Sequence, residues 1–120
     1  MKKLITLIAI MIFSLSAFAQ IAKVEGSEEV LKENLADNRV VFIMPSEMTS
    51  ETIEKSAQYY TDYFTVDYDE KSQKAKILLI SGDESDRRVI VRFLLSSGVR
   101  TISFAGSDYT IMEFYSSFLE

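Results

Sequence analysis

The stretch Val40-Val41-Phe42-Ile43-Met44-Pro45 decides the fold that this sequence predicts. Its first five residues are apolar and mostly β-branched or aromatic, which is typical of a strand buried on both faces, and the proline ends it. Residues 75–80 form a second nearly continuous apolar run. Residues 65–69 and 100–104 instead alternate apolar with polar side chains, as half-exposed strands do. We therefore expect two central strands and two edge strands.

Two helices are expected between these strands. With Thr49 as N-cap, Met48 and Ile53 take the two positions of a hydrophobic staple, and apolar residues then recur at helical spacing as far as Phe64. A second helix begins at Asp83 or Ser85 and ends before a glycine at position 98. The resulting order, β-α-β-β-α-β, predicts an α+β, ferredoxin-like sandwich over residues 39–106. In that fold the first and third strands are central, which agrees with their continuous apolar character.

Both ends of the mature chain are expected to add a helix to this domain. Residues 20–38 form an N-terminal helical extension, opened by Ser27 and two glutamates, and residues 107–120 form a C-terminal helix that packs on the domain. Because central strands that are apolar throughout need cover on both faces, we expect the terminal helices, or a second subunit, to cover the face that the crossover helices leave free.

Residues 1–19 have the three parts of a secretory signal peptide. Lys2 and Lys3 precede an apolar run over residues 4–15, and the small residues Ala17 and Ala19 flank Phe18 in a cleavage pattern that predicts a cut after Ala19. An uncleaved membrane anchor is the alternative. After cleavage no stretch approaches 18 apolar residues, so we expect a periplasmic or secreted protein with no stable membrane insertion.

Composition narrows the function. The mature chain has eleven Lys and Arg against eighteen Asp and Glu, a net charge of −7, which argues against nucleic acid or anionic lipid as the partner. The sequence has no Cys and no His, which removes thiolate nucleophiles, zinc fingers, and the commonest general base and metal ligand. We expect no catalytic residues, no enzyme activity and no cofactor.

One loop carries a resemblance to a known family. Residues 47–53 read Glu47-Met48-Thr49-Ser50-Glu51-Thr52-Ile53, after a buried strand and before a helix. From about 40 to 104 the chain resembles the heavy-metal-associated domain of copper chaperones, which has the same order of elements and carries G-M-T-C-x-x-C at this place. Met48 and Thr49 match, whereas Ser50 and Ile53 stand where the two cysteines are expected. The resemblance implies the family scaffold without its metal ligands, because neither a serine hydroxyl nor an isoleucine replaces a thiolate.

Other candidate ligands have simpler interpretations. Met44 and Met48 are soft ligands close to the same loop, but both positions suit packing. Two acidic runs, residues 67–70 and 83–86, lack the spacing of a calcium loop and are interpreted as an edge strand and a helix N-terminus.

Tyr59 and Tyr63 are the candidate contact surface, four residues apart on one helix face, unless the terminal helices cover them. The sequence thus predicts an exported, non-catalytic protein-interaction or scaffold module whose partner is an unknown protein or a second copy. The alternatives are a residual metal carrier or sensor that uses methionine and carboxylate ligands, and an exported enzyme that uses carboxylate, serine or tyrosine chemistry.

Overall fold

The computed structural model describes residues 21–120, so the predicted signal peptide and its cleavage after Ala19 lie outside the described residues. The strands are β1 (Ile21–Val24), β2 (Arg39–Ile43), β3 (Phe64–Asp69), β4 (Lys74–Leu79), β5 (Thr101–Phe104) and β6 (Ser107–Thr110). The helices are α2 (Glu28–Ala36), α3 (Ser50–Ala57), α4 (Glu84–Ser96) and α5 (Ile111–Phe114), with a 3-10 turn η1 (Gln58–Tyr60) and a π-helical end η2 (Tyr115–Leu119). The α+β class is as predicted.

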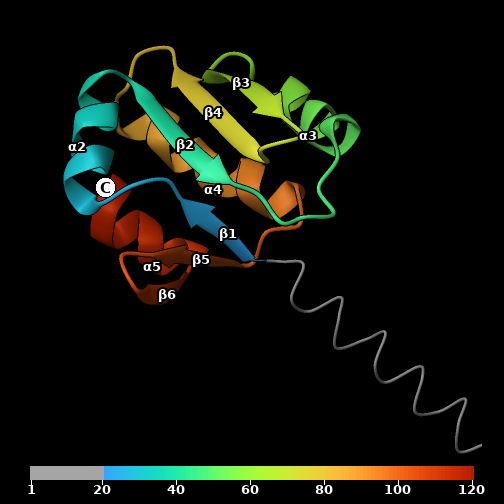
Figure 1. Ribbon diagram of the computed structural model, residues 1–120. Coiled ribbons are helices and arrows are strands. Elements are labelled where there is room, and N and C mark those ends of the chain that lie inside the picture. Colours follow the sequence, from blue (N-terminus) through green and yellow to red (C-terminus); the bar gives the residue numbers. More distant parts are fainter. Residues whose placement is uncertain (1–20) are drawn as a thin grey trace, which may run out of the picture.

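The strands form one mixed sheet in the order β3-β4-β2-β1-β5-β6 (Figure 1). All neighbours are antiparallel except β1 and β5, which are parallel. This order differs from the predicted ferredoxin-like sheet, in which β2 and β5 would be neighbours. The N-terminal extension, expected to be helical, begins with β1, which lies between β2 and β5. With four residues and a lysine at its third position, β1 is too short to show a strand period in the sequence.

Helix α2 begins where it was predicted, and α3 is shorter than predicted. Thr49 caps α3, its hydroxyl accepting from the Thr52 N–H at 3.3 Å, and Met48 and Ile53 are both buried in the core. The helix ends at Ala57, however, and Phe64 opens β3 instead of closing the helix. Tyr60 and Phe64 stack at 5.9 Å between ring centroids, so the apolar spacing reflects shared burial and not one continuous helix.

Helix α4 has the ends that the sequence predicts. The Asp83 carboxylate accepts from the Asp86 N–H at 3.1 Å, and Gly98 has a φ of 99°. The N–H groups of Gly98 and Val99 donate to the carbonyls of Leu95 and Leu94, which is the Schellman pattern.

The C-terminal segment differs from its prediction. Ala105 and Gly106, both with positive φ, make a hairpin turn from β5 into β6, so residues 107–110 are a strand and not the start of a helix. The helix begins at Ile111 behind a Thr110 N-cap. Phe114 is fully buried, so this end of the chain packs against the rest of the fold.

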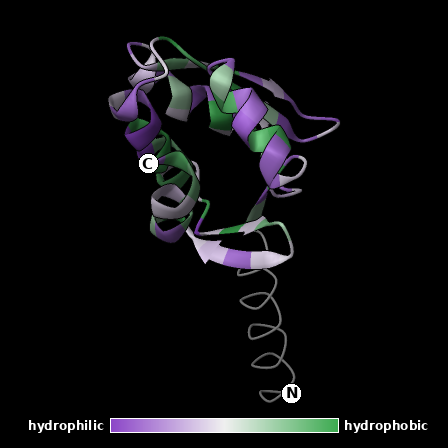
Figure 2. Ribbon diagram, turned by 90° about the vertical axis from the view of Figure 1, so that its left-hand side faces the viewer, coloured by the Kyte–Doolittle hydropathy of each residue, from purple (hydrophilic) through white to green (hydrophobic). Residues whose placement is uncertain are grey.

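The helices lie on one face of the sheet, where a single core contains side chains from both layers (Figures 1 and 2). Phe42, Phe64, Phe93 and Phe114 are the largest fully buried side chains of this core. No element of residues 21–120 covers the other face (Figure 1). Lys74, Lys76 and Leu78 of the central strand β4 are exposed there, so the prediction that the terminal helices cover the face left free by the crossover helices is wrong. The alternative, that a second subunit covers it, stays a prediction. Cover on one face is enough, because exposed and buried residues alternate along β4. The sequence does not show this alternation clearly, since the last residues of the strand are all apolar.

Candidate functional site on the open face of the sheet

The uncovered surface, here called the open face, is built by the alternation of strand residues. On β3 it receives Thr65, Asp67 and Asp69, and on β4 it receives Lys74, Lys76 and Leu78. The antiparallel register pairs them directly, and the three cross-strand pairs are Thr65 with Leu78, Asp67 with Lys76, and Asp69 with Lys74. Each acid on the edge strand therefore has a lysine opposite it on the inner strand.

The middle of the open face is a shallow depression of about 330 Å³. Val41 lies at its floor and is 7% exposed, although it does not belong to the core on the other side of the sheet. Charged side chains surround it, and Lys74 Nζ donates to Glu25 Oε1 at 2.6 Å. The wall residues are Glu25, Asp67, Asp69, Ser72, Lys74 and Lys76. Because acids and lysines share the wall, the depression has no clear preference for an anion or a cation.

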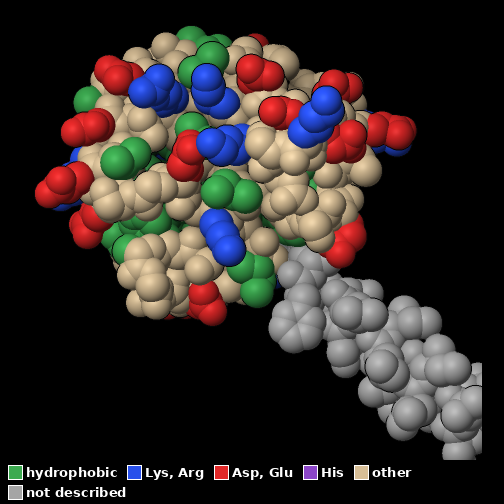
Figure 3. Space-filling view, viewed as in Figure 1, with side chains coloured by type: hydrophobic (Ala, Val, Ile, Leu, Met, Phe, Trp, Pro, Cys, Tyr) green, Lys and Arg blue, Asp and Glu red, His purple; other side chains and the backbone are tan. Residues whose placement is uncertain are grey.

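Lys and Arg side chains lie across this face, with hydrophobic and acidic side chains between them (Figure 3). Within residues 21–120 the ion pairs are Arg39 with Asp37, Lys74 with Glu25, and Arg88 with Glu84. Lys76 and Asp67 face each other across the strands without closing to ion-pair distance. Both groups are therefore available to a partner.

One end of the open face is apolar. The N–H of Ile80 donates to the carbonyl of Tyr63 at 3.0 Å, which continues the pairing of β3 with β4 by one step. Strand alternation then places Tyr63, Leu78 and Ile80 together on the open face, where they are 39%, 43% and 59% exposed. We call these three residues the apolar corner. Exposed aromatic and aliphatic side chains gathered in one place are typical of contact surfaces.

The predicted contact residues Tyr59 and Tyr63 are both at the surface, and Tyr59 is 76% exposed. The alternative, that the terminal helices cover them, is wrong, since those helices pack on the other side of the sheet. The two residues do not share a helix face, because α3 has ended before Tyr59. Tyr63 belongs to the apolar corner and Tyr59 to η1.

The loop that resembles the metal-binding family, residues 47–53, has a structural role. Thr49 caps α3, Ile53 is 1% exposed, and the Ser50 N–H donates to Glu70 Oε1 at 3.1 Å. The Met48 carbonyl accepts from the Tyr68 hydroxyl at 2.9 Å, and burial, helped by Glu70 and Asp69, raises the pKa of that hydroxyl.

The candidate soft ligands Met44 and Met48 are 2% and 9% exposed and belong to the core. Their side chains pack against other apolar groups, which favours the packing interpretation of both residues. Across residues 21–120, no three His, Cys, Asp or Glu side chains are placed to hold a metal ion together. Nor does this part of the chain contain a helix that is long and apolar enough to cross a membrane.

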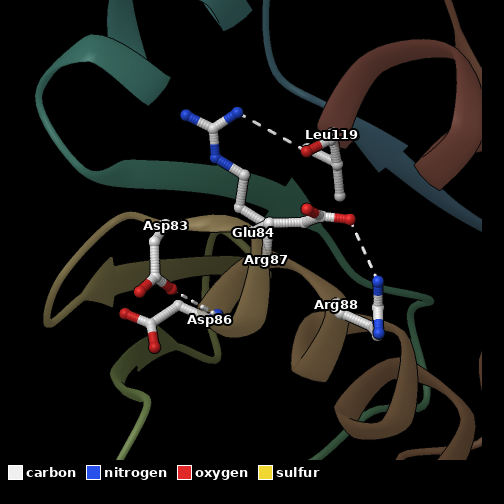
Figure 4. A network of polar contacts seen from close by, with 6 residues as sticks. All are labelled: Asp83, Glu84, Asp86, Arg87, Arg88 and Leu119. Carbon is white, nitrogen blue, oxygen red and sulfur yellow. Dashed lines mark hydrogen bonds and ion pairs between the residues drawn. The ribbon is translucent and has the colours of Figure 1, made fainter.

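The second acidic run supports helix α4 and its contact with the C-terminus (Figure 4). Asp83 is the N-cap, Glu84 pairs with Arg88 at 3.0 Å, and Arg87 Nη1 donates to the Leu119 carbonyl at 3.5 Å. These contacts are structural, and they join the first turns of α4 to the end of η2.

Within the same run, Asp86 is buried. Its carboxylate accepts from the Ser81 N–H at 2.7 Å, the Ser81 hydroxyl at 2.9 Å and the Gly82 N–H at 3.1 Å. Burial by itself would raise the pKa of Asp86, but these three donors outweigh it and hold the pKa below its ordinary value.

The sequence predicts Tyr63 of the apolar corner as a contact residue but not Leu78 or Ile80, because the apolar run over residues 75–80 indicates a fully buried strand. A signal for these two residues was present. Lys74 and Lys76 stand two residues apart, and the same alternation assigns Leu78 and Ile80 to their face.

Comparisons of this chain with protein-family models, with curated proteins and with solved structures found no match. The resemblance to the heavy-metal-associated domain over residues 40–104 is therefore supported by no comparison and stays a prediction.

Proposed function

We propose that this chain is an exported, non-catalytic protein-interaction module and that the open face of the sheet is its contact surface. Export is inferred from the signal-peptide pattern of residues 1–19. The observation that carries the contact surface is the apolar corner, with Ile80 at 59% exposure beside a band of charged side chains. An apolar patch next to polar and charged groups is the usual composition of a protein interface.

The scaffold of this module is inferred to be a ferredoxin-like arrangement into which β1 has been inserted. Leaving β1 and β6 out of the order β3-β4-β2-β1-β5-β6 gives β3-β4-β2-β5, which is the strand order of that fold. The inserted strand widens the sheet, and because no helix within residues 21–120 covers the second face, the widening enlarges the open surface. A degenerate metal-chaperone scaffold adapted to protein contact is consistent with this arrangement.

Site-specific photo-cross-linking in the intact host cell tests the contact surface. A photoreactive residue replaces Leu78 on the open face or, as a matched control, Met112 on α5, which is exposed to 59%. We expect a discrete cross-linked product from position 78 and none from position 112. No product from position 78, or the same products from both positions, would contradict the proposal. The mass of the product also tells whether the partner is this chain or another one.

A further inference from the structure

We infer that the occupant of the open face is a second copy of this chain, packed face to face over strands β3 and β4. This inference rests on the proposed function, because it requires the open face to be a contact surface. It goes further by naming the partner and the geometry. The argument depends on the register of β3 with β4 and on the charges of the open face.

The open face is balanced in charge, unlike the rest of the molecule. Its six strands, together with Glu25 directly after β1, carry four cations, Lys23, Arg39, Lys74 and Lys76, and four acids, Glu25, Asp67, Asp69 and Asp108. The net charge of −7 that residues 20–120 carry therefore lies on the other surfaces. Two copies that meet by their helical sides would bring like charges together, whereas two copies that meet by the open face would not.

The charges are also sorted by strand. Asp67 and Asp69 lie on β3, and the lysines opposite them, Lys76 and Lys74, lie on β4. A two-fold axis parallel to these strands and midway between them exchanges β3 with β4 of the second copy and keeps each row of the register. Each acid of one copy then faces the lysine of its own row on the other copy. The same rotation sets Tyr63 over Ile80 and Thr65 over Leu78.

This arrangement is self-complementary in every row, as an isologous dimer requires. Two sheets packed face to face lie about 10 Å apart, a distance that lysine side chains and a tyrosine ring can fill from both sides. The contact involves two strands of each copy, so it belongs to the small interfaces, below about 1,200 Å² in total, that make weak and reversible dimers.

The test uses two double variants of the mature chain, residues 20–120. The acidic variant, Lys74→Glu with Lys76→Glu, has acids on both strands, and the basic variant, Asp67→Lys with Asp69→Lys, has cations on both strands. Sedimentation equilibrium is measured from about 1 µM to 1 mM, the range expected for a small interface. We expect the unaltered chain to dimerise and each variant alone to dimerise at least about tenfold more weakly. Mixed in equal amounts, the two variants should form a heterodimer, because every row is again an acid facing a lysine.

Two controls keep the result specific. Lys55→Glu with Arg92→Glu makes the same change in net charge on exposed positions of α3 and α4, and it should leave the dimer intact. Ile80→Glu should dissociate the dimer, whereas Met112→Glu, at a position of equal exposure, should not. Circular dichroism melts confirm that each variant is folded before its association is measured.

The inference is overturned if the unaltered chain stays monomeric up to 1 mM, or if the mixture of variants associates no better than either one alone. Neither result removes the proposed function. In that case a cross-link from position 78 to a different protein would keep the open face as a contact surface and assign it to another partner. Absence of any cross-link would remove both.

Discussion

Asp86 shows how a single buried charge can be held by the backbone. It is the only charged side chain among the buried residues of 21–120, and it is 5% exposed. The N–H groups of Ser81 and Gly82 converge on its carboxylate at 2.7 and 3.1 Å, at the point where β4 turns into α4. A charge-assisted hydrogen bond is stronger than a neutral one, and here two of them fix the path of the loop.

We predict that Asp86→Asn destabilises the protein by about 2 kcal/mol at pH 7, since the amide keeps the shape and loses the charge that the donors require. The folded-state pKa of Asp86 lies below the unfolded value of about 3.9. Its contribution is therefore fully present above that value and is lost as the pH falls further, through the folded-state pKa. Thermal melts of both proteins between pH 7 and pH 2.5 measure this. A difference that stays constant over the whole range would contradict the assignment.

Gly98 carries the second prediction at this scale. Its φ of 99° is unfavourable for a residue with a side chain, and a Cβ built there would meet no atom within 4 Å. The cost of a substitution is therefore the backbone strain alone. We expect Gly98→Val to lower the free energy of unfolding by ~1 kcal/mol or more, and Gly98→Asn to lower it less, because asparagine adopts positive φ more readily. Urea denaturation compares the two, and equal stability of all three proteins would contradict this account.

At the scale of elements, the sequence predicts a helix well where a capping side chain or a glycine marks its end. Ser27, Thr49 and Asp83 each cap the helix that their side-chain oxygens indicate, and Gly98 ends α4. The prediction fails where the apolar spacing of a helix continues into the next element. Phe64 continues the apolar spacing of α3, yet it begins β3, because Tyr60 and Phe64 reach the same core from a turn and a strand.

Two short strands could not be predicted from local pattern. β1 and β6 have four residues each, as β5 has, but neither follows a predicted helix as β5 does, and the position of each is set by the strand that it pairs with. The open face follows from the same limit. The apolar residues at the end of β4 predict a strand that is buried on both faces. The pairing of β4 with β3, which the sequence does not show, places Leu78 on the exposed face beside Thr65.

The position of β1 leads to a prediction about the whole sheet. Lys23 and Val24 pair with β2, and Ile21, Ala22 and Lys23 pair with β5, so this strand joins two strands that are not neighbours in the sheet. We expect a chain that starts at residue 27 to lose its cooperative thermal transition, because β2 and β5 then expose unpaired edges and Ala22 and Val24 leave the core. Melts of this chain and of residues 20–120 compare them. A cooperative melt of the shorter chain would show that β1 is dispensable.

At the scale of the whole molecule, the helical layer and the open face have different roles. The apolar groups that stabilise the fold lie between the helices and one side of the sheet, and they include both methionines of the family-like loop region. The surface groups that could bind a partner lie on the other side. The two candidate soft ligands, Met44 and Met48, are therefore within the core, and the carboxylates of β3 are on the surface.

This separation predicts the outcome of a metal titration. Met44 and Met48 are 2% and 9% exposed, so they would have to leave the core to coordinate Cu(I). The free energy lost by opening the core would offset the free energy gained from metal binding. We expect an anaerobic competition titration of residues 20–120 with Cu(I) and Zn(II) to show no binding tighter than about micromolar, where structural sites bind far more tightly. Tight one-to-one copper binding that disappears in Met48→Ala would contradict this and make the loop a metal site. If the binding instead persisted in Met48→Ala, the ligands would have to be sought first among the remaining thioethers, Met44 and the exposed Met112, because Cu(I) prefers sulfur to carboxylate ligands.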